Sequence, residues 1–243
     1  MPGSGTIVNA AAIIIGGLLG LLVKRFIKES FQKTINAAMA LSIIAMSVSD
    51  MVAHMLVVSD AAVSTRGTYM MIASLVLGGI IGELADLDGK MEQFGRYLKE
   101  KTGNAKDAAF VDAFVTSSLT VCIGAMAVMG AIMDGIKHDY SILFTKAILD
   151  FVIIMVMSAS MGKGCIFSAI PVALFQGFFT ALSVLIAPFL NELAMDNLSI
   201  VGSVLILCIG VNLLGGGKFK IKVANLLPAI VFAVLAAYVP FLR

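Results

Sequence analysis

The sequence predicts an all-α, polytopic membrane helix bundle with about eight transmembrane helices. Of its 243 residues, 60% are hydrophobic and only 13% are charged, and the mean hydropathy is +1.02. Soluble domains carry about 25% charged and about 45–50% apolar residues, so this excess of apolar side chains requires a hydrocarbon solvent. The net charge of +2 gives no field that would attract nucleic acid. Membrane lipid is therefore an expected partner, and nucleic acid is not.

Eight apolar runs have about the length that a helix needs to cross roughly 30 Å of hydrocarbon. The residues before the first run lack the basic segment and cleavage site of a secretory signal, so we expect this run to remain as a membrane span. The third run is short and ends in acidic residues, so a count of seven with a re-entrant third segment is the alternative. The runs are residues 7–23, 35–58, 69–84, 113–133, 142–161, 165–187, 198–214 and 223–242.

Lysine and arginine are distributed very unequally between the two sides of the predicted bundle. The connections after the first, third, fifth and seventh spans hold 13 of them, whereas the opposite side holds three. Because basic loops are retained on the cytoplasmic side, we expect both termini to lie outside the cytoplasm. Three tyrosines, Tyr69, Tyr140 and Tyr238, then fall at outer boundaries, where their amphipathic rings suit the headgroup level.

The longest connection, residues 85–110, carries Met91, Phe94 and Leu98 at helical spacing among charged residues. This pattern is typical of an amphipathic helix on the cytoplasmic interface, and a solvated charged loop is the alternative. We interpret residues 1–243 as a single integral membrane domain. Its parts are repeat one (5–84), the connection (85–110), repeat two (111–190) and a C-terminal helix pair (197–243).

The two three-helix repeats are predicted to be inverted copies of each other. A shift of 113 residues pairs the first span with the fourth and the second with the fifth, with eight identities in 42 positions. Spans one to three start outside and spans four to six start inside, and such inverted repeats are typical of secondary transporters. A competing, parallel match aligns Gly16 and Gly20 with Gly78 and Gly82. Both glycine pairs have the small-xxx-small spacing that brings helices close together.

Asp150 is the most informative residue, because it is the ninth residue of a twenty-residue span. A carboxylate near the midplane costs about 2.5–3.5 kcal/mol to insert. Lys146 lies one turn earlier on the same face. Either the two charges neutralise each other, or Lys146 snorkels outward while Asp150 faces a water-filled cavity as a proton or cation site. We favour the second arrangement.

Uncharged polar residues of the sixth and fourth spans are further candidates. Gln176 lies near mid-depth and precedes Gly177, which allows a ligand to come close. Its amide either binds a polar substrate or forms a bond between helices. The first half of the fourth span is rich in hydroxyl groups that line a water-filled path or bind neighbouring backbone. These hydroxyls belong to Thr116, Ser117, Ser118 and Thr120.

Two further candidates lie near span ends. Asp50 and His54 share a face of the second span, where a carboxylate beside an imidazole could relay protons. A local hydrogen bond at the membrane boundary is the alternative, and we favour it. Among the asparagines near span ends we select Asn225, which precedes Pro228, as a binding candidate.

Catalytic and metal-binding motifs are absent from the sequence. His54 and His138 are the only histidines, and no His-Glu-x-x-His, Gly-x-Ser-x-Gly or phosphate-binding glycine pattern occurs. The three cysteines fall inside apolar runs, so we interpret them as buried thiols and not as disulfide or metal ligands. We therefore expect that the protein is not an enzyme and uses no metal and no cofactor.

Several short motifs together resemble one known family. They are Gly5-Thr-Ile-Val-Asn9, Cys122-Ile-Gly-Ala-Met126, Lys146-x-x-x-Asp150, Ser168-Ala-Ile, Gln176-Gly177 and Asn225-Leu-Leu-Pro228. With these motifs, nearly the whole chain resembles the YqgA/YdfK-like family of bacterial integral membrane proteins, a domain of unknown function. The resemblance implies a multi-pass protein of the bacterial plasma (inner) membrane. It implies no substrate and no functional residue.

These observations predict a small secondary transporter or facilitator for a small solute or ion. Its polar site would combine Asp150 and Gln176 with the hydroxyls of the fourth span, and Asp150 would couple transport to a proton or sodium ion. The glycine-lined faces would permit a homodimer. One alternative is an oligomeric ion or small-solute channel. The other is a structural or sensory membrane protein without flux, in which Lys146 fully neutralises Asp150.

Overall fold

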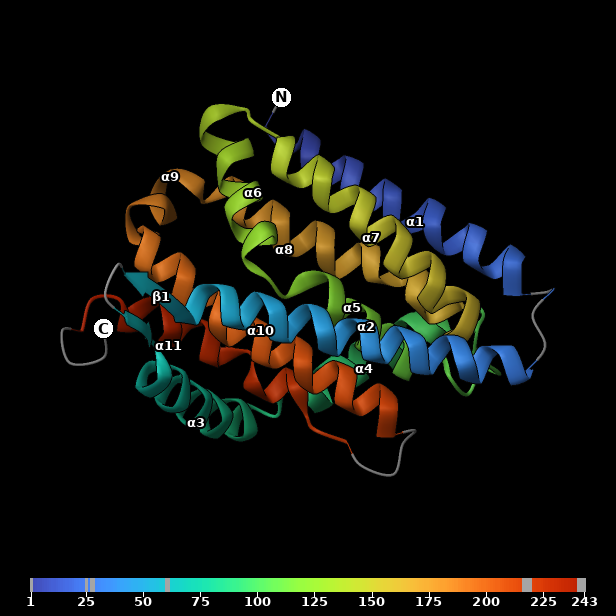
Figure 1. Ribbon diagram of the computed structural model, residues 1–243. Helices are drawn as coiled ribbons and strands as arrows, with labels where there is room; N and C mark the ends of the chain where they lie inside the picture. The colour runs from blue at the N-terminus through green and yellow to red at the C-terminus, as the bar shows by residue number, and fades with distance from the viewer. Residues whose placement is uncertain (1, 25, 27–28, 60–61, 216–219, 240–243) are drawn as a thin grey trace. The chain divides into compact units, whose positions relative to one another are not determined.

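The computed structural model describes residues 2–24, 26, 29–59, 62–215 and 220–239, and most of them are helical (Figure 1). This confirms the predicted all-α class. The α-helices are α1 (Ser4–Lys24), α2 (Glu29–Met55), α3 (Thr68–Ala85), α4 (Leu87–Lys101), α5 (Phe110–Cys122), α6 (Ala125–Lys137), α7 (Ser141–Met161), α8 (Ala169–Ala181), α9 (Ser183–Ile186), α10 (Glu192–Gly215) and α11 (Pro228–Ala236). Short 3₁₀ segments are η1 (Lys163–Ser168), η2 (Ala187–Phe189) and η3 (Val223–Leu226).

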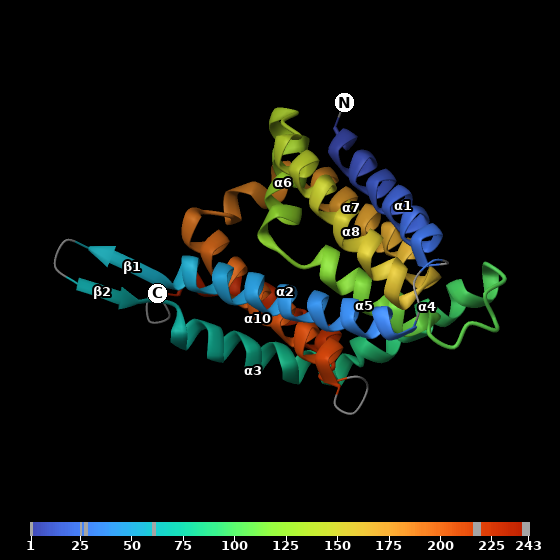
Figure 2. The ribbon, with the colours of Figure 1, turned by 45° about the vertical axis from the view of Figure 1, so that its right-hand side comes forward.

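A small hairpin replaces the end of the second predicted span. The helix α2 stops at Met55, and the chain continues as strand β1 (Leu56–Ser59), which pairs antiparallel with β2 (Ala62–Thr65) before α3 begins (Figure 2). The β-branched Val57 and Val58 favour the extended conformation. The expectation that this span stays helical to residue 58 was therefore wrong, although the 23 residues of Lys33–Met55 remain long enough to cross a membrane.

Six helices of the described residues are long and apolar enough to cross a membrane. They coincide with predicted spans one, two, three, five, six and seven. The third span, α3, is one continuous helix of 18 residues. The eighth is shorter, Val223–Ala236, and its predicted last residues, 240–242, lie outside the described residues. The exact number of crossings therefore stays a prediction.

The fourth predicted span is broken in the middle. The helix α5 ends at Cys122, Ile123 is extended, and α6 starts at Ala125 with its axis bent by 62°. The backbone of Gly124 has φ 143° and ψ 151°, a conformation that is essentially restricted to glycine. A hydropathy pattern does not detect such a break, because the residues on both sides are equally apolar.

We expect Gly124→Ala to lower the free energy of unfolding by about 1–3 kcal/mol, because alanine is strained at this backbone conformation. A Cβ at Gly124 would contact none of the described residues within 4 Å, so the loss would report backbone strain alone. Gly177→Ala is the matched control, since Gly177 also faces open space but lies within helix α8. Chemical unfolding in detergent should show a loss at position 124 and none at position 177. Equal effects at both positions would contradict the strained break.

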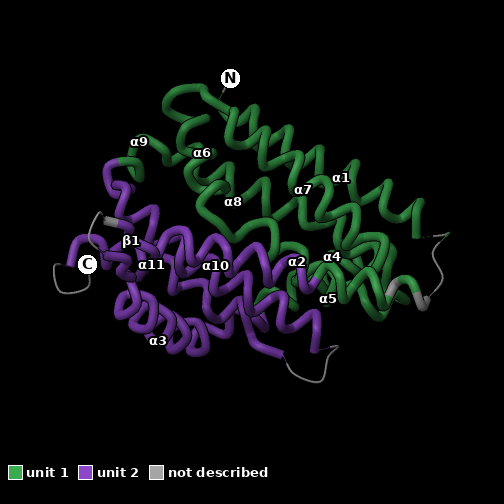
Figure 3. The backbone as a smooth tube through the Cα atoms, in the orientation of Figure 1, with its two compact units in different colours: residues 1–39, 90–187 green, residues 40–89, 188–243 purple. Residues whose placement is uncertain are grey.

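The chain forms two compact units that interleave along the sequence (Figure 3). Unit 1 comprises residues 1–39 and 90–187, and unit 2 comprises residues 40–89 and 188–243. Unit 1 therefore combines the first part of predicted repeat one with nearly all of predicted repeat two. The inverted relation between the repeats stays a prediction.

In unit 1, helices α1 and α7 lie side by side and run in the same direction (Figures 1 and 2). A Cβ at Gly16 would come 2.5 Å from the carbonyl oxygen of Phe151, and one at Gly20 would overlap the carbonyl of Met155. The two glycines therefore form the contact surface, as their spacing predicts. The absence of side chains at these positions lets α1 lie directly on the backbone of α7.

Unit 2 uses the second glycine pair in the same way. The helix α3 contacts η3 and α11, and a Cβ at Gly78 or Gly82 would overlap their backbone. In each unit a Gly-Gly-x-x-Gly helix thus lies against a 3₁₀ segment and a following helix that contains a proline. These prolines are Pro171 in α8 and Pro228 in α11. The helix α8 follows η1 and contacts α1. In unit 1, however, Gly16 and Gly20 pack on α7 and not on η1 or α8, so the parallel match between the two glycine motifs stays a prediction.

The charged connection contains the amphipathic helix α4, so the alternative of an irregular solvated loop was wrong. The Phe94 ring lies 5.8 Å from the Phe114 ring of α5, and Leu98 is buried. The apolar face of α4 therefore packs at least partly on protein.

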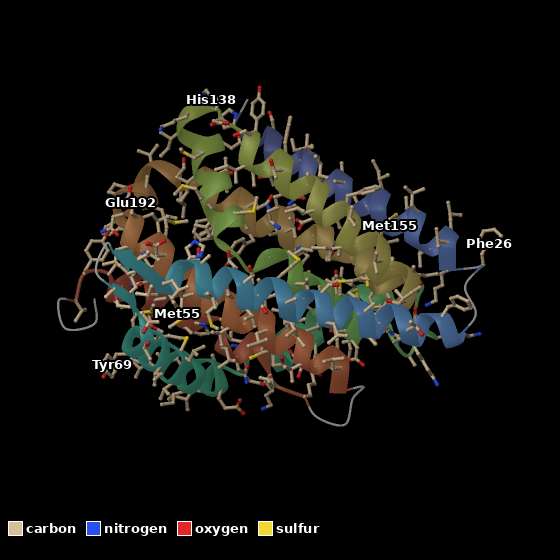
Figure 4. All side chains as sticks on the ribbon, in the orientation of Figure 1. Phe26, Met55, Tyr69, His138, Met155 and Glu192 are labelled. Carbon is tan, nitrogen blue, oxygen red and sulfur yellow. The ribbon has the colours of Figure 1, made fainter. Side chains whose placement is uncertain are left out.

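The three tyrosines predicted at outer boundaries are all exposed. Tyr69 projects from the first turn of α3 (Figure 4) and is 79% exposed. An exposed amphipathic ring at a helix end suits the headgroup level. The side of the membrane that these helix ends face stays a prediction.

Candidate functional site

A lysine and an aspartate one turn apart on α7 form a buried ion pair in unit 1. The Lys146 Nζ lies 2.8 Å from Oδ1 and 2.7 Å from Oδ2 of Asp150, and the residues are 7% and 3% exposed. The two charges therefore neutralise each other. Our expectation that Lys146 snorkels outward while Asp150 faces a cavity was wrong for this conformation, because the lysine stem reaches both carboxylate oxygens along its own helix.

The break in the fourth span supplies another ligand to the ammonium group. The carbonyl oxygen of Val121, in the last turn of α5, accepts a hydrogen bond from Lys146 Nζ at 2.8 Å. The last carbonyls of a helix have no partner within that helix, and this end carries a partial negative charge. In a continuous helix the Val121 carbonyl would instead accept the backbone N–H of Ala125. The break thus creates a binding position for a cation.

Asn9 of α1 completes the cluster from the other side. Its Nδ2 donates a hydrogen bond of 2.9 Å to Asp150 Oδ2, and the residue is fully buried. This role of Asn9 was not predicted from the sequence, because Asn9 lies near a span end, where asparagine commonly caps a helix. A signal was nevertheless present: Asn9, Gly16 and Gly20 are seven and eleven residues apart and share the helix face that packs on α7.

Unit 1 also contains polar atoms that are buried without a hydrogen-bond partner among the described residues. Gln176 is 1% exposed, and both its Nε2 and its Oε1 are unpartnered. Thr180 lies one turn further along the buried face of α8, and its hydroxyl is also unpartnered. Within the described part of the chain, such atoms belong to Thr6, Asn9, Asn36, Ser118, Ser158, Gln176 and Thr180. All seven belong to unit 1.

Two of the predicted hydroxyls of the fourth span, those of Ser117 and Thr120, bind the backbone of their own helix. Ser117 donates to the carbonyl of Ala113 at 2.7 Å, and Thr120 donates to the carbonyl of Thr116 at 2.8 Å. Such bonds satisfy a buried hydroxyl locally. In α5 the unpartnered hydroxyl is that of Ser118, so this residue is the better binding candidate.

Asp50 and His54 lie in unit 2 and form a local contact at the end of α2. The His54 Nδ1 is 2.8 Å from the backbone oxygen of Asp50 and 3.6 Å from its carboxylate. The carboxylate accepts a hydrogen bond from Ser203, and more than half of the Asp50 side chain is exposed. This geometry agrees with the favoured interpretation of a local hydrogen bond.

Asn225 also lies in unit 2, not in the unit that holds Asp150, and it joins η3 to the α3–α4 junction. Its Nδ2 donates to Glu83 at 2.6 Å, and its Oδ1 accepts the backbone N–H of Asp88 at 2.7 Å. Lys222 pairs with the same Glu83 at 2.7 Å, and this hydrogen bond raises the pKa of Lys222. With both amide atoms in use, Asn225 has a structural role in this conformation.

A second buried carboxylate was not identified from the sequence. Asp134, near the end of α6, is fully buried, and it accepts the backbone N–H groups of Gly3 at 3.1 Å and Gly5 at 2.9 Å. It therefore binds the positive N-terminal end of α1. This contact joins residues that are 131 and 129 positions apart in the sequence, so no local pattern could have revealed it.

Residues 4–238 match a protein family described as "Protein of unknown function (DUF554)". The chain is 25% identical over 235 residues to the "Uncharacterized membrane protein YdfK" of Bacillus subtilis (strain 168), which covers 97% of this chain and 96% of that protein. It is 27% identical over 236 residues to the "Uncharacterized protein YqgA" of Escherichia coli (strain K12), with 94% of each chain covered. No solved structure is significantly similar.

Proposed function

We propose that this chain, which belongs to the DUF554 family as its motifs indicate, is a small secondary transporter or facilitator. It moves a small polar solute or ion across the bacterial plasma membrane along the buried polar side chains of unit 1. The observation that carries this proposal is the burial of Gln176: it is 1% exposed, and neither its amide nitrogen nor its amide oxygen has a hydrogen-bond partner among the described residues.

The unpartnered amide is costly. Leaving a buried donor or acceptor without a hydrogen bond costs about 1–3 kcal/mol, and a leucine at this position would avoid that cost. Gln176, Thr180 and Ser118 together offer both donors and acceptors on helices α8 and α5. A small solute with its own donors and acceptors fits such a lining better than a bare ion does.

The broken helix supports the same function. Many secondary transporters form their binding sites with discontinuous helices, because the ends of half-helices offer free backbone groups to ions and polar solutes inside the bilayer. In this chain the end of α5 contacts Lys146 directly. Ion binding would be coupled to transport through the pair of Lys146 and Asp150. A proton or cation that binds Asp150 would weaken its pairing with Lys146 and so alter the contacts among α1, α5 and α7 together.

A channel and a non-transporting protein are the alternatives. A channel needs a continuous polar stripe, but the buried face of α6 includes Ala127, Ala131 and Ile132. A non-transporting protein accounts for the sealed pair of Lys146 and Asp150 but gives no reason for the unpartnered polar atoms. An alternating-access transporter accounts for both, because each is a feature of one closed conformation in its cycle.

Cysteine accessibility distinguishes these functions. In a background without Cys122, Cys165 and Cys208, a single cysteine at position 176 or 116 is treated in sealed vesicles with a membrane-impermeant thiol reagent from either side. We expect reaction at both positions, with rates from the two sides that change in opposite directions when a pH gradient is imposed. Similar rates from both sides indicate a channel, and no reaction at either position indicates a protein without flux. Phe178→Cys is the control, because the exposed Phe178 side chain should react only with a membrane-permeant reagent.

A further inference from the structure

The Lys146 ammonium is surrounded by oxygen atoms like a bound metal cation. It lies 2.8 Å and 2.7 Å from the two carboxylate oxygens of Asp150 and 2.8 Å from the carbonyl oxygen of Val121. Carboxylate and backbone carbonyl oxygens are the ligands that hard cations prefer. In transporters with broken helices, the carbonyl end of a half-helix is a binding position for sodium.

A further oxygen is available at the same place. Asn9 binds Asp150 through Nδ2, while its Oδ1 is buried and has no partner among the described residues. Rotation of the amide about its last bond exchanges the positions of Nδ2 and Oδ1. Asn9 can therefore turn an oxygen toward a cation that is held by Asp150 and Val121. Three elements of unit 1, namely α1, α5 and α7, thus supply a ready set of oxygen ligands.

We propose that this cluster is a monovalent cation site that the chain fills with its own ammonium group. Lys146 is a tethered substitute for a metal ion, so the native protein binds no sodium or potassium at Asp150. Shortening Lys146 should create a site for a small cation at the position of Nζ. The consequence for coupling, that sodium is not the coupling ion at this position, rests on the transport function proposed above. Ion binding itself is tested by protein stability and not by flux. The cation-site proposal and the transport proposal can therefore fail independently.

The test compares thermal unfolding of four purified proteins in detergent: the native chain, Lys146→Ala, Asp150→Asn and the double variant Lys146→Ala with Asp150→Asn. Each is measured with increasing sodium, potassium or methylammonium chloride, and with choline chloride at the same ionic strength as the control. We expect Lys146→Ala to be destabilised in choline and to regain several degrees of Tm in a saturable way with at least one small cation. The other three proteins should respond to the small cations no more than to choline.

Two results would overturn the proposal. One is a Lys146→Ala protein whose Tm responds to small cations no more than to choline. The other is an equal response in the double variant, because the cation would then not be held by Asp150. If Lys146→Ala does not yield folded protein, Lys146→Ser replaces it. Failure of both variants to fold even when they are extracted in sodium, potassium or methylammonium also overturns the proposal, because no cation then replaces the ammonium.

Discussion

Removing one charge of the Lys146 and Asp150 pair should lower the free energy of unfolding by about 3–5 kcal/mol, and removing both should cost far less. Each single variant, Lys146→Met or Asp150→Asn, leaves the remaining charge buried without its counter-ion. The pair is at most 7% exposed, so water cannot solvate that charge. In the double variant no buried charge lacks a counter-ion, and the methionine side chain fills the space that the lysine stem occupied.

A double-mutant cycle measures this coupling in detergent-solubilised protein by chemical unfolding. The matched control is the exposed pair of Glu92 and Arg96 on α4, which has the same spacing along its helix and a distance of 3.4 Å. Its coupling energy should be at most about 0.5 kcal/mol. Additive losses at positions 146 and 150 would show that the two charges do not compensate each other in the folded protein.

Gln176→Leu is expected to abolish transport while it stabilises the protein. Replacing an unpartnered buried amide with an apolar side chain of similar size removes an unfavourable burial of about 1–3 kcal/mol. The same change removes the polar lining that a solute would contact. Stability and function should therefore change in opposite directions, which a purely structural role does not predict.

Flux is measured in proteoliposomes as the rate of reswelling after an osmotic step with glycerol, urea or glycine. Native protein should accelerate reswelling with at least one of these solutes by tenfold or more over empty vesicles, and Gln176→Leu should return the rate to that of empty vesicles. Phe178→Leu is the control on the same helix, because the Phe178 side chain is 56% exposed and should affect neither property. Loss of stability in Gln176→Leu would mean that the amide has a structural partner.

The membrane-spanning elements were largely predictable, because hydropathy is a local property of the chain. All six long apolar helices of the structure coincide with predicted spans. The break at Gly124 and the early end of α2 at Met55 were missed, because both depend on backbone conformation within uniformly apolar sequence. The glycine pairs were correctly interpreted as packing surfaces, since their spacing alone places them on one helix face.

The candidate site was only half predictable. Lys146 and Asp150 are one turn apart, so their spacing identifies a pair, but their burial and orientation depend on what packs against α7. Asn9 is 141 positions from Asp150, and Val121 contributes a backbone carbonyl that its side chain does not reveal. Conversely, the sequence indicated Asn225 as a binding residue, but both of its amide atoms form hydrogen bonds within unit 2.

The sequence by itself determined that the protein resides in a membrane, which segments become helices, and that two opposite charges, Lys146 and Asp150, lie one helical turn apart. These features depend only on composition and on spacing along the chain. Only the tertiary structure decided that those charges face inward and meet a broken helix and the amide of Asn9. The physical reason is that the free energy of a buried polar group depends on the atoms within hydrogen-bonding distance. In this fold those atoms come from helices far apart in the chain, which the side-chain-free surfaces at Gly16 and Gly20 allow to approach.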